Sequence, residues 1–224
     1  MKFNHDNISP LDSRYANKIS ELRENFSESA LIKIRFNIEI EWLLYICINL
    51  PKTFKPLSKQ SIKKIAKFKD SFDNKSVLKI KKIESTTNHD VKAVEYYIRD
   101  YFLKDKVLST YIHLIHFGLT SEDINSLSYA HMIKDGIYIY IKELDKVNKI
   151  LKNYSKKWAK QPFLARTHGQ AASPSTLGKE FKVFHERINR EMQHLKSIKP
   201  LAKFSGATGN YHTFDIVDSK LNWI

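Results

Sequence analysis

The sequence predicts an all-α protein, and three observations support that prediction. Glycine and proline are scarce, with 6 of each in 224 residues, which favours long uninterrupted elements over many turns. Hydrophobic residues make up 42% and charged residues 28% of the chain, an ordinary globular composition that argues against disorder throughout. Apolar residues also recur at helical spacings of three and four along several long segments.

The first long helix is expected at residues 27–50, "SESALIKIRFNIEIEWLLYICINL". Ser27 is a candidate N-cap, and Pro51 would stop the helix. Apolar side chains occur on more than one of its faces, so we expect burial on more than one side. A short lysine-rich helix follows, and "NHDVKAVEYYIRDYFLK" then predicts a helix that Asn88 would cap. Its apolar stripe contains Val91, Val94, Ile98 and Phe102.

Two long helices are expected in the second half of the chain. The first would run unbroken from Ser121 to Trp158. The second would have Ser173 as its cap and Pro174 in its first turn, and it would end at Pro200. Joined by a polar loop, they would form an antiparallel pair. Their apolar stripes are Ile133, Ile137, Ile141, Leu144, Val147, Leu151, Tyr154 and Trp158, and Leu177, Phe181, Phe184, Ile188, Met192 and Leu195.

A stable helical bundle usually needs four or more helices, and this pair supplies two. We therefore expect an N-terminal helical domain at residues 1–115 and a partial central bundle at residues 116–224. Other chains would complete the bundle, or the sequence would be the N-terminal portion of a longer protein. Alone, the chain should self-associate or be poorly soluble.

Composition excludes several classes of protein. The longest apolar run, "WLLYICINL", is far below the roughly 20 residues that span a bilayer. The N-terminus lacks the basic start, apolar middle and cleavage site of a secretory signal. The single cysteine, Cys47, lies in the same apolar run and is most simply a reduced core residue. We therefore expect a cytoplasmic protein without membrane contact.

The formal net charge of +14 raises a second hypothesis, a basic helical protein that binds nucleic acid. The lysines are spread over nearly every segment, and the densest run, residues 58–69, has the spacing of a solvated helix face. Nucleic acid is therefore the weaker hypothesis, although a positive potential would favour an anionic small substrate.

Three polar clusters lie at predicted helix ends or near the N-terminus, in places where catalytic groups are often held. "SPLDSRY" offers a planar guanidinium for phosphate or carboxylate and a phenol donor. "TTNHDVKAVE" crowds polar residues at a helix N-terminus, which favours an anion, although plain capping is the preferred explanation of this stretch taken alone. "HFGLTSEDINS" starts the longest helix with two hydroxyls, of which one could be a cap. The candidate residues are Arg14, Tyr15, Asn88, His89, Asp90, Thr120 and Ser121.

The fourth cluster is "ARTHGQAASPSTLGKE", residues 165–180. His168 could give or take a proton near neutral pH, and Gly169 permits a close approach or an unusual backbone conformation. A histidine bonded to a loop carbonyl explains this motif when it is taken by itself. The four clusters together favour an enzyme site.

Five stretches of the sequence, in order, resemble the bacterial form of the adenylosuccinate lyase family, within the fumarase and aspartase superfamily. They are "SPLDSRY", "ESTTNHDVKAVEYY", "HFGLTSEDINSLS", "RTHGQAASPSTLGKE" and "GATGNY". "THGQ" alone would indicate only the superfamily. "TTNHDVKAVEY" favours this lyase over argininosuccinate lyase, fumarase or aspartase.

The resemblance implies a β-elimination that cleaves a carbon-nitrogen bond and releases fumarate, without metal or organic cofactor. The substrates would be adenylosuccinate, giving AMP, and the succinylated carboxamide ribotide of purine synthesis. By motif match, His168 would be the general acid that protonates the departing nitrogen. The substrate-binding residues would be Arg14, Tyr15, Asn88, His89, Asp90, Thr120 and Ser121.

The sequence departs from the family at its end. Members are much longer, and their remainder completes the bundle, adds a C-terminal helical domain and carries the mobile loop whose serine is the general base. That loop does not follow Ile224, and nothing beyond nearby glycines recommends Ser205 as a substitute. The family also builds each active site from several subunits of a homotetramer. We therefore expect this chain alone to be inactive, and a non-catalytic remnant that needs a separately encoded second half is the other alternative.

Overall fold

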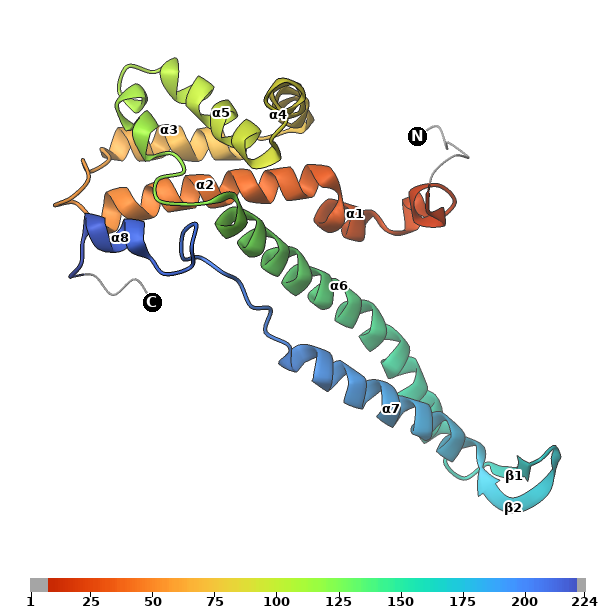
Figure 1. Ribbon diagram of the computed structural model, residues 1–224. Coiled ribbons are helices and arrows are strands. Elements are labelled where there is room, and N and C mark those ends of the chain that lie inside the picture. Colours follow the sequence, from red (N-terminus) through yellow and green to blue (C-terminus); the bar gives the residue numbers. More distant parts are fainter. Residues whose placement is uncertain (1–7, 221–224) are drawn as a thin grey trace. The chain divides into compact units, whose positions relative to one another are not determined.

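The computed structural model describes residues 8–220, and its described part is mainly helical (Figure 1). The all-α prediction is confirmed, with one small hairpin as the exception. No helix in this part is long and apolar enough to cross a membrane. The helices are α1 (Ser20–Phe26), α2 (Glu28–Asn49), α3 (Lys59–Asp70), α4 (Asn74–Thr87), α5 (Asp90–Leu103), α6 (Ser121–Lys157), α7 (Leu177–Ser197) and α8 (His212–Val217), with short 3-10 turns at Pro10–Asp12, Ala16–Lys18 and Leu108–Leu114.

The chain divides into two compact units. The first comprises residues 1–133 and 200–224, and the second comprises residues 134–199, so that α6 contributes to both. The domain boundary expected between residues 115 and 116 stays a prediction.

Helix α2 lies at the centre of the first unit and packs against α1, α3, α4 and α5. The Ser27 side chain accepts a hydrogen bond from the Ala30 N–H, which confirms the predicted cap. Apolar residues on several of its faces are fully buried, as predicted, and the Phe36 ring lies 5.1 Å from Phe68 and 4.7 Å from Phe72. Burying one such side chain is worth about 1.5–3 kcal/mol. Cys47 is a core residue of this helix, and burial raises the pKa of its thiol to about 11.

The junction between α4 and α5 corrects one prediction. Asn88 does not cap α5; it ends α4 in the left-handed conformation, with φ 50°. Asparagine tolerates that conformation better than most residues, and the chain needs it here to turn sharply between two helices. His89 is the cap of α5 instead, and its Nδ1 accepts from the Lys92 N–H at 3.1 Å.

Helix α6 begins at Ser121 and ends at Lys157, within one residue of the prediction. The Asp123 carboxylate, which is fully buried, accepts from the Thr120 N–H at 2.9 Å and stabilises the first turn. The same carboxylate accepts from the backbone N–H groups of Ser205 at 2.9 Å and Gly206 at 3.2 Å, and from Lys203 Nζ at 2.8 Å. The "SGATG" loop is therefore fixed to the start of α6.

The second unit contains the rest of α6, a hairpin of β1 (Pro162–Thr167) and β2 (Gln170–Thr176), and helix α7. Ser173 and Pro174 are in β2, so their prediction as the start of the helix is wrong; Thr176 is the cap, and its hydroxyl accepts from the Lys179 N–H. The residue before a proline is biased towards extended backbone, which favours a strand here. Gly178 lies where an added Cβ would be 2.5 Å from the Ser155 carbonyl oxygen.

Large apolar side chains of this second unit are exposed, as expected of a helix pair that lacks bundle partners. They include Tyr138, Tyr140, Val147, Ile150, Tyr154 and Phe184.

Candidate active site

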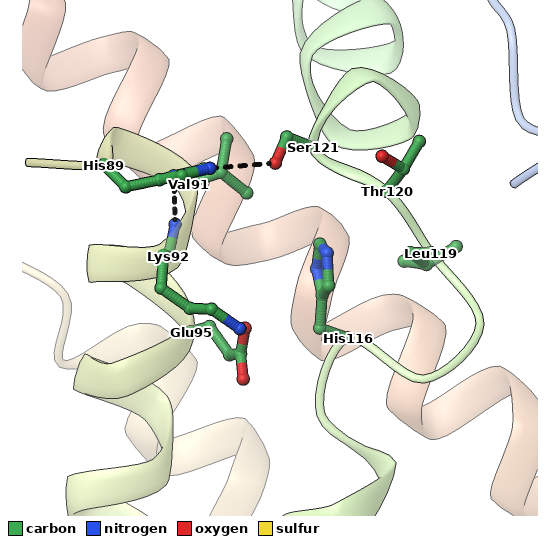
Figure 2. A pocket seen from close by; sticks show the side chains of 8 residues that line it. All are labelled: His89, Val91, Lys92, Glu95, His116, Leu119, Thr120 and Ser121. Carbon is green, nitrogen blue, oxygen red and sulfur yellow. Dashed lines mark hydrogen bonds and ion pairs between the residues drawn. The ribbon is translucent and has the colours of Figure 1, made fainter. Parts of the chain in front are cut away.

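A pocket with a cavity volume of about 150 Å³ lies in the first unit, between the start of α5 and the segment that leads into α6. Figure 2 shows how its side chains converge from these two parts of the chain. The lining residues are His89, Val91, Lys92, Glu95, His116, Leu119, Thr120 and Ser121. Two clusters that the sequence predicted separately, one at His89 and one at Thr120 and Ser121, therefore meet in one pocket.

His89 and Ser121 are in direct polar contact across this pocket, with 3.4 Å between Nε2 and Oγ. Because Nδ1 of His89 accepts the Lys92 N–H, the proton of the neutral ring belongs on Nε2. Nε2 is therefore the donor to Ser121. Both groups have exposed surface, which leaves them accessible to a ligand.

Asp90 is held by an ion pair instead of lining the pocket. Its Oδ2 lies 2.7 Å from Arg35 on α2, a side chain that is only 5% exposed. Burial alone would raise the pKa of Asp90, but the Val91 N–H and the Arg35 guanidinium outweigh it and lower the pKa. Asp90 therefore remains a carboxylate at neutral pH and fixes the first turn of α5 against α2.

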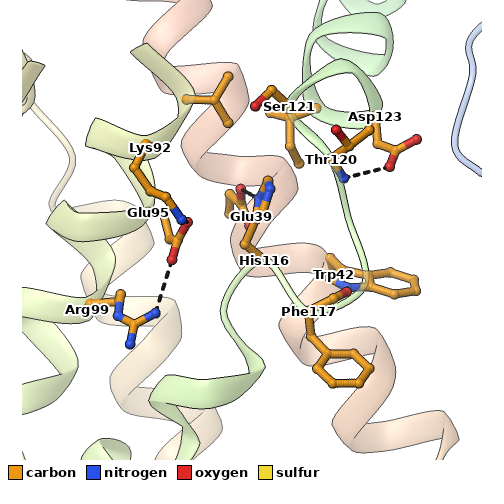
Figure 3. Close-up of polar contacts among 12 residues, drawn as sticks. Glu39, Trp42, Lys92, Glu95, Arg99, His116, Phe117, Thr120, Ser121 and Asp123 are labelled. Atoms are coloured by element: carbon orange, nitrogen blue, oxygen red, sulfur yellow. Dashed lines mark hydrogen bonds and ion pairs between the residues drawn. The ribbon is translucent and has the colours of Figure 1, made fainter. Parts of the chain in front are cut away.

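His116 and Glu39 form a buried pair beneath the pocket, with 2.6 Å between Nδ1 and Oε1 (Figure 3). Burial raises the pKa of Glu39, and the hydrogen bond and charge of His116 oppose that rise only in part. Burial would lower the pKa of His116, but the Glu39 carboxylate outweighs it and raises the pKa. Both shifts favour a pair that holds a proton to higher pH than the separate groups would.

A second buried carboxylate, Glu95, has two cations beside it. Lys92 Nζ lies 2.6 Å and Arg99 Nη1 lies 3.0 Å from its oxygens. Lys92 also lines the pocket, so its ammonium group can meet an anionic ligand there. No group of three or more His, Cys, Asp or Glu side chains arranged to hold a metal ion occurs within residues 8–220.

The remaining predicted residues lie elsewhere. Arg14 and Tyr15 are exposed near the N-terminus, with the guanidinium 5.5 Å from the ring, and neither lines the pocket. Asn88 is exposed beside His89. His168 is at the turn of the hairpin in the second unit, exposed and in the left-handed conformation with φ 50°.

Sequence reasoning missed the buried charges behind the pocket. Arg35 and Glu39 occur inside the otherwise apolar helix α2, and charged residues on a buried helix need partners, so this signal was available. The signal for Asp123 was also present, since it is the third residue after Thr120 and can reach back to that N–H.

A protein-family model described as a lyase matches residues 13–221, and the chain therefore belongs to this lyase family. Its curated relatives include adenylosuccinate lyases. The proteins of Buchnera aphidicola subsp. Schizaphis graminum, Dictyostelium discoideum and Escherichia coli are 40%, 39% and 37% identical to it. These matches cover 96%, 97% and 96% of this chain and 48% of each relative. They confirm the resemblance, and the chain spans about half the length of these relatives.

Solved structures of other enzymes share the fold. A fumarate lyase from Mesorhizobium sp. BNC1 superimposes with a TM-score of 0.69 at 19% identity, over 86% of this chain and 44% of that chain. A β-carboxy-cis,cis-muconate cycloisomerase from Acinetobacter calcoaceticus gives 0.67 at 18% identity, over 89% of this chain and 46% of that chain. The helices of this chain therefore correspond to part of the fold of those enzymes.

Proposed function

We propose that this chain supplies the substrate pocket and the general acid of an adenylosuccinate lyase. The enzyme would release fumarate from adenylosuccinate to give AMP, and from the succinylated aminoimidazole carboxamide ribotide. The observation that supports this most is the contact of His89 with Ser121, because it joins two of the family's motifs in one pocket. The family match favours this function over nucleic-acid binding.

The elimination begins when a base removes a proton from the carbon beside a carboxylate, and negative charge then develops on that carboxylate. Hydroxyl, ammonium and imidazole donors that are already in place stabilise such charge without reorganisation. Thr120, Ser121, Lys92 and the Nε2–H of His89 are donors of this kind around the pocket.

The carbon-nitrogen bond then breaks, its electron pair stays on nitrogen, and that nitrogen takes a proton. His168 is the residue we assign as the proton donor, since a histidine can supply a proton near neutral pH. Arg14, Tyr15, Asn88 and Asp90 complete the proposed binding set. The general-base serine, a homotetrameric assembly in the cytoplasm and the absence of a cofactor are taken from the family and belong to the same proposal.

The test is fumarate release from adenylosuccinate by the purified 224-residue chain, alone and mixed with the second half of the Escherichia coli relative. We expect negligible turnover alone and measurable turnover in the mixture. His168→Gln should then reduce kcat by about 10²–10⁴-fold, the contribution typical of a general acid. His194→Gln, an exposed histidine on α7, is the matched control and should retain the rate.

Turnover by the chain alone at the rate of a full-length relative would refute the proposal that this chain needs a second half for activity. Equal rates for the His168 and His194 variants would refute the assignment of the acid. Binding of duplex or single-stranded nucleic acid that weakens steeply with salt, without turnover, would favour the alternative function.

A further inference from the structure

Helix α2 holds the chain at residues 116 and 117 with two side chains that are one helical turn apart. Glu39 Oε1 lies 2.6 Å from His116 Nδ1, and the Trp42 indole Nε1–H donates to the Phe117 carbonyl at 2.8 Å (Figure 3). His116 itself has φ 61°, a left-handed conformation that costs a non-glycine residue energy and persists only where its surroundings enforce it. The ring is therefore fixed through both its backbone and its Nδ1 atom.

Glu39 differs from the other carboxylate behind the pocket. The charge of Glu95 is balanced by Lys92 and Arg99. The Glu39 side chain is fully buried, and His116 is its one polar partner among residues 8–220. Its Oε2 has no hydrogen-bond partner in that described part. A buried carboxylate in this state is costly, so packing and stability alone do not explain its presence.

The His116 ring has only one nitrogen occupied by protein. Nδ1 faces Glu39, and no described residue bonds Nε2, while the residue as a whole lines the pocket. We propose that Glu39 is a positioning residue that keeps the ring proton of His116 on Nδ1 and so presents Nε2 to the ligand. Its part in the lyase reaction rests on the function proposed above.

The charges that face His116 come from two helices, α2 and α5. Glu39 on α2 and Glu95 on α5 favour the imidazolium, and Lys92 on α5 opposes it. His89, at the start of α5, and Ser121 lie on the other side of the pocket. Because Lys92 is already paired with Glu95, Glu39 has the largest effect on the protonation of the ring.

The test is nitrogen NMR of the histidine rings in the wild-type chain, Glu39→Gln and Glu41→Gln. Glutamine has nearly the size of glutamate and keeps an acceptor oxygen, but it removes the charge. Glu41 is the matched control, since it is on the same helix and is 60% exposed. We expect the neutral wild-type ring to carry its proton on Nδ1. The pKa of His116 should fall in Glu39→Gln and stay unchanged in Glu41→Gln.

A neutral wild-type ring with its proton on Nε2 would overturn the proposal. So would a Glu39→Gln variant that keeps the wild-type titration of His116. If Glu39→Gln fails to fold, which thermal melting detects, the wild-type tautomer alone decides the matter.

The lyase assay of the mixed halves gives the functional readout. Glu39→Gln should lower kcat by about 10²-fold, the scale of lost positioning, with little change in KM, and should shift the pH profile. A purely structural role would lower the amount of folded protein and leave the pH profile in place. Because the NMR result does not depend on turnover, failure of the proposed function and failure of this inference give different results.

Discussion

Asp123→Asn is the substitution that tests most directly how the start of α6 is built. The carboxylate is fully buried and accepts four hydrogen bonds, two at each oxygen. Asparagine replaces one oxygen by an NH₂ group, which cannot accept from the two donors that face it. Hydrogen bonds to a charged group contribute about 1.5–3 kcal/mol each, so two lost bonds predict a decrease of about 3 kcal/mol or more in the free energy of unfolding.

The assay for Asp123→Asn is urea unfolding, compared with Asp135→Asn as a control at an exposed position on the same helix. Amide hydrogen exchange at Ser205 and Gly206 adds a local readout, because both N–H groups donate to Asp123. We expect faster exchange at these two amides. A loss below about 0.5 kcal/mol, the range of ordinary surface substitutions, would show that the four contacts do not stabilise the loop.

Two further predictions concern packing and pH. Gly178→Ala should destabilise the second unit by about 1–3 kcal/mol, because the added methyl group would lie 2.5 Å from the Ser155 carbonyl oxygen; an unchanged thermal melt would contradict this. The pKa of Asp90 is lowered in the folded chain, so its ion pair with Arg35 stabilises the fold above the unfolded pKa of about 3.9 and is lost as pH falls through the folded value. Between about pH 5 and pH 2, the free energy of unfolding of Asp90→Asn in urea titrations should therefore fall less than that of the wild type. The same pH dependence in both proteins would refute this account.

The long helices were predictable because their signals are local. Ser27 and Pro51 bound α2, and the start of α6 at Ser121 follows from its polar first turn and long apolar stripe. The prediction that Ser173 and Pro174 begin a helix failed for a physical reason. Serine before proline is compatible with both a helix start and an extended strand, and pairing with β1, including Pro174 opposite Leu164, decides between them.

Three of the eight residues that line the pocket, His89, Thr120 and Ser121, were among the candidates named from the sequence, and the buried groups behind the pocket were not. His89, Thr120 and Ser121 could be named because they belong to polar motifs at helix starts, where binding and catalytic groups are often held. The contact of Glu39 with His116 joins positions 77 residues apart, and that of Lys203 with Asp123 joins positions 80 apart. Such pairs depend on how the helices pack, which periodicity along one segment does not report.

The capping role of His89 constrains its charge. Its Nδ1 lone pair is committed to the Lys92 N–H, so a second proton on the ring would have to release the first turn of α5. In the folded chain the Nε2 atom of His89 is therefore the ring nitrogen that can donate to a ligand. The ammonium group of Lys92 supplies positive charge to the pocket. A ligand that forced a second proton onto His89 would break the hydrogen bond between His89 and the Lys92 N–H, and it would loosen the first turn of α5.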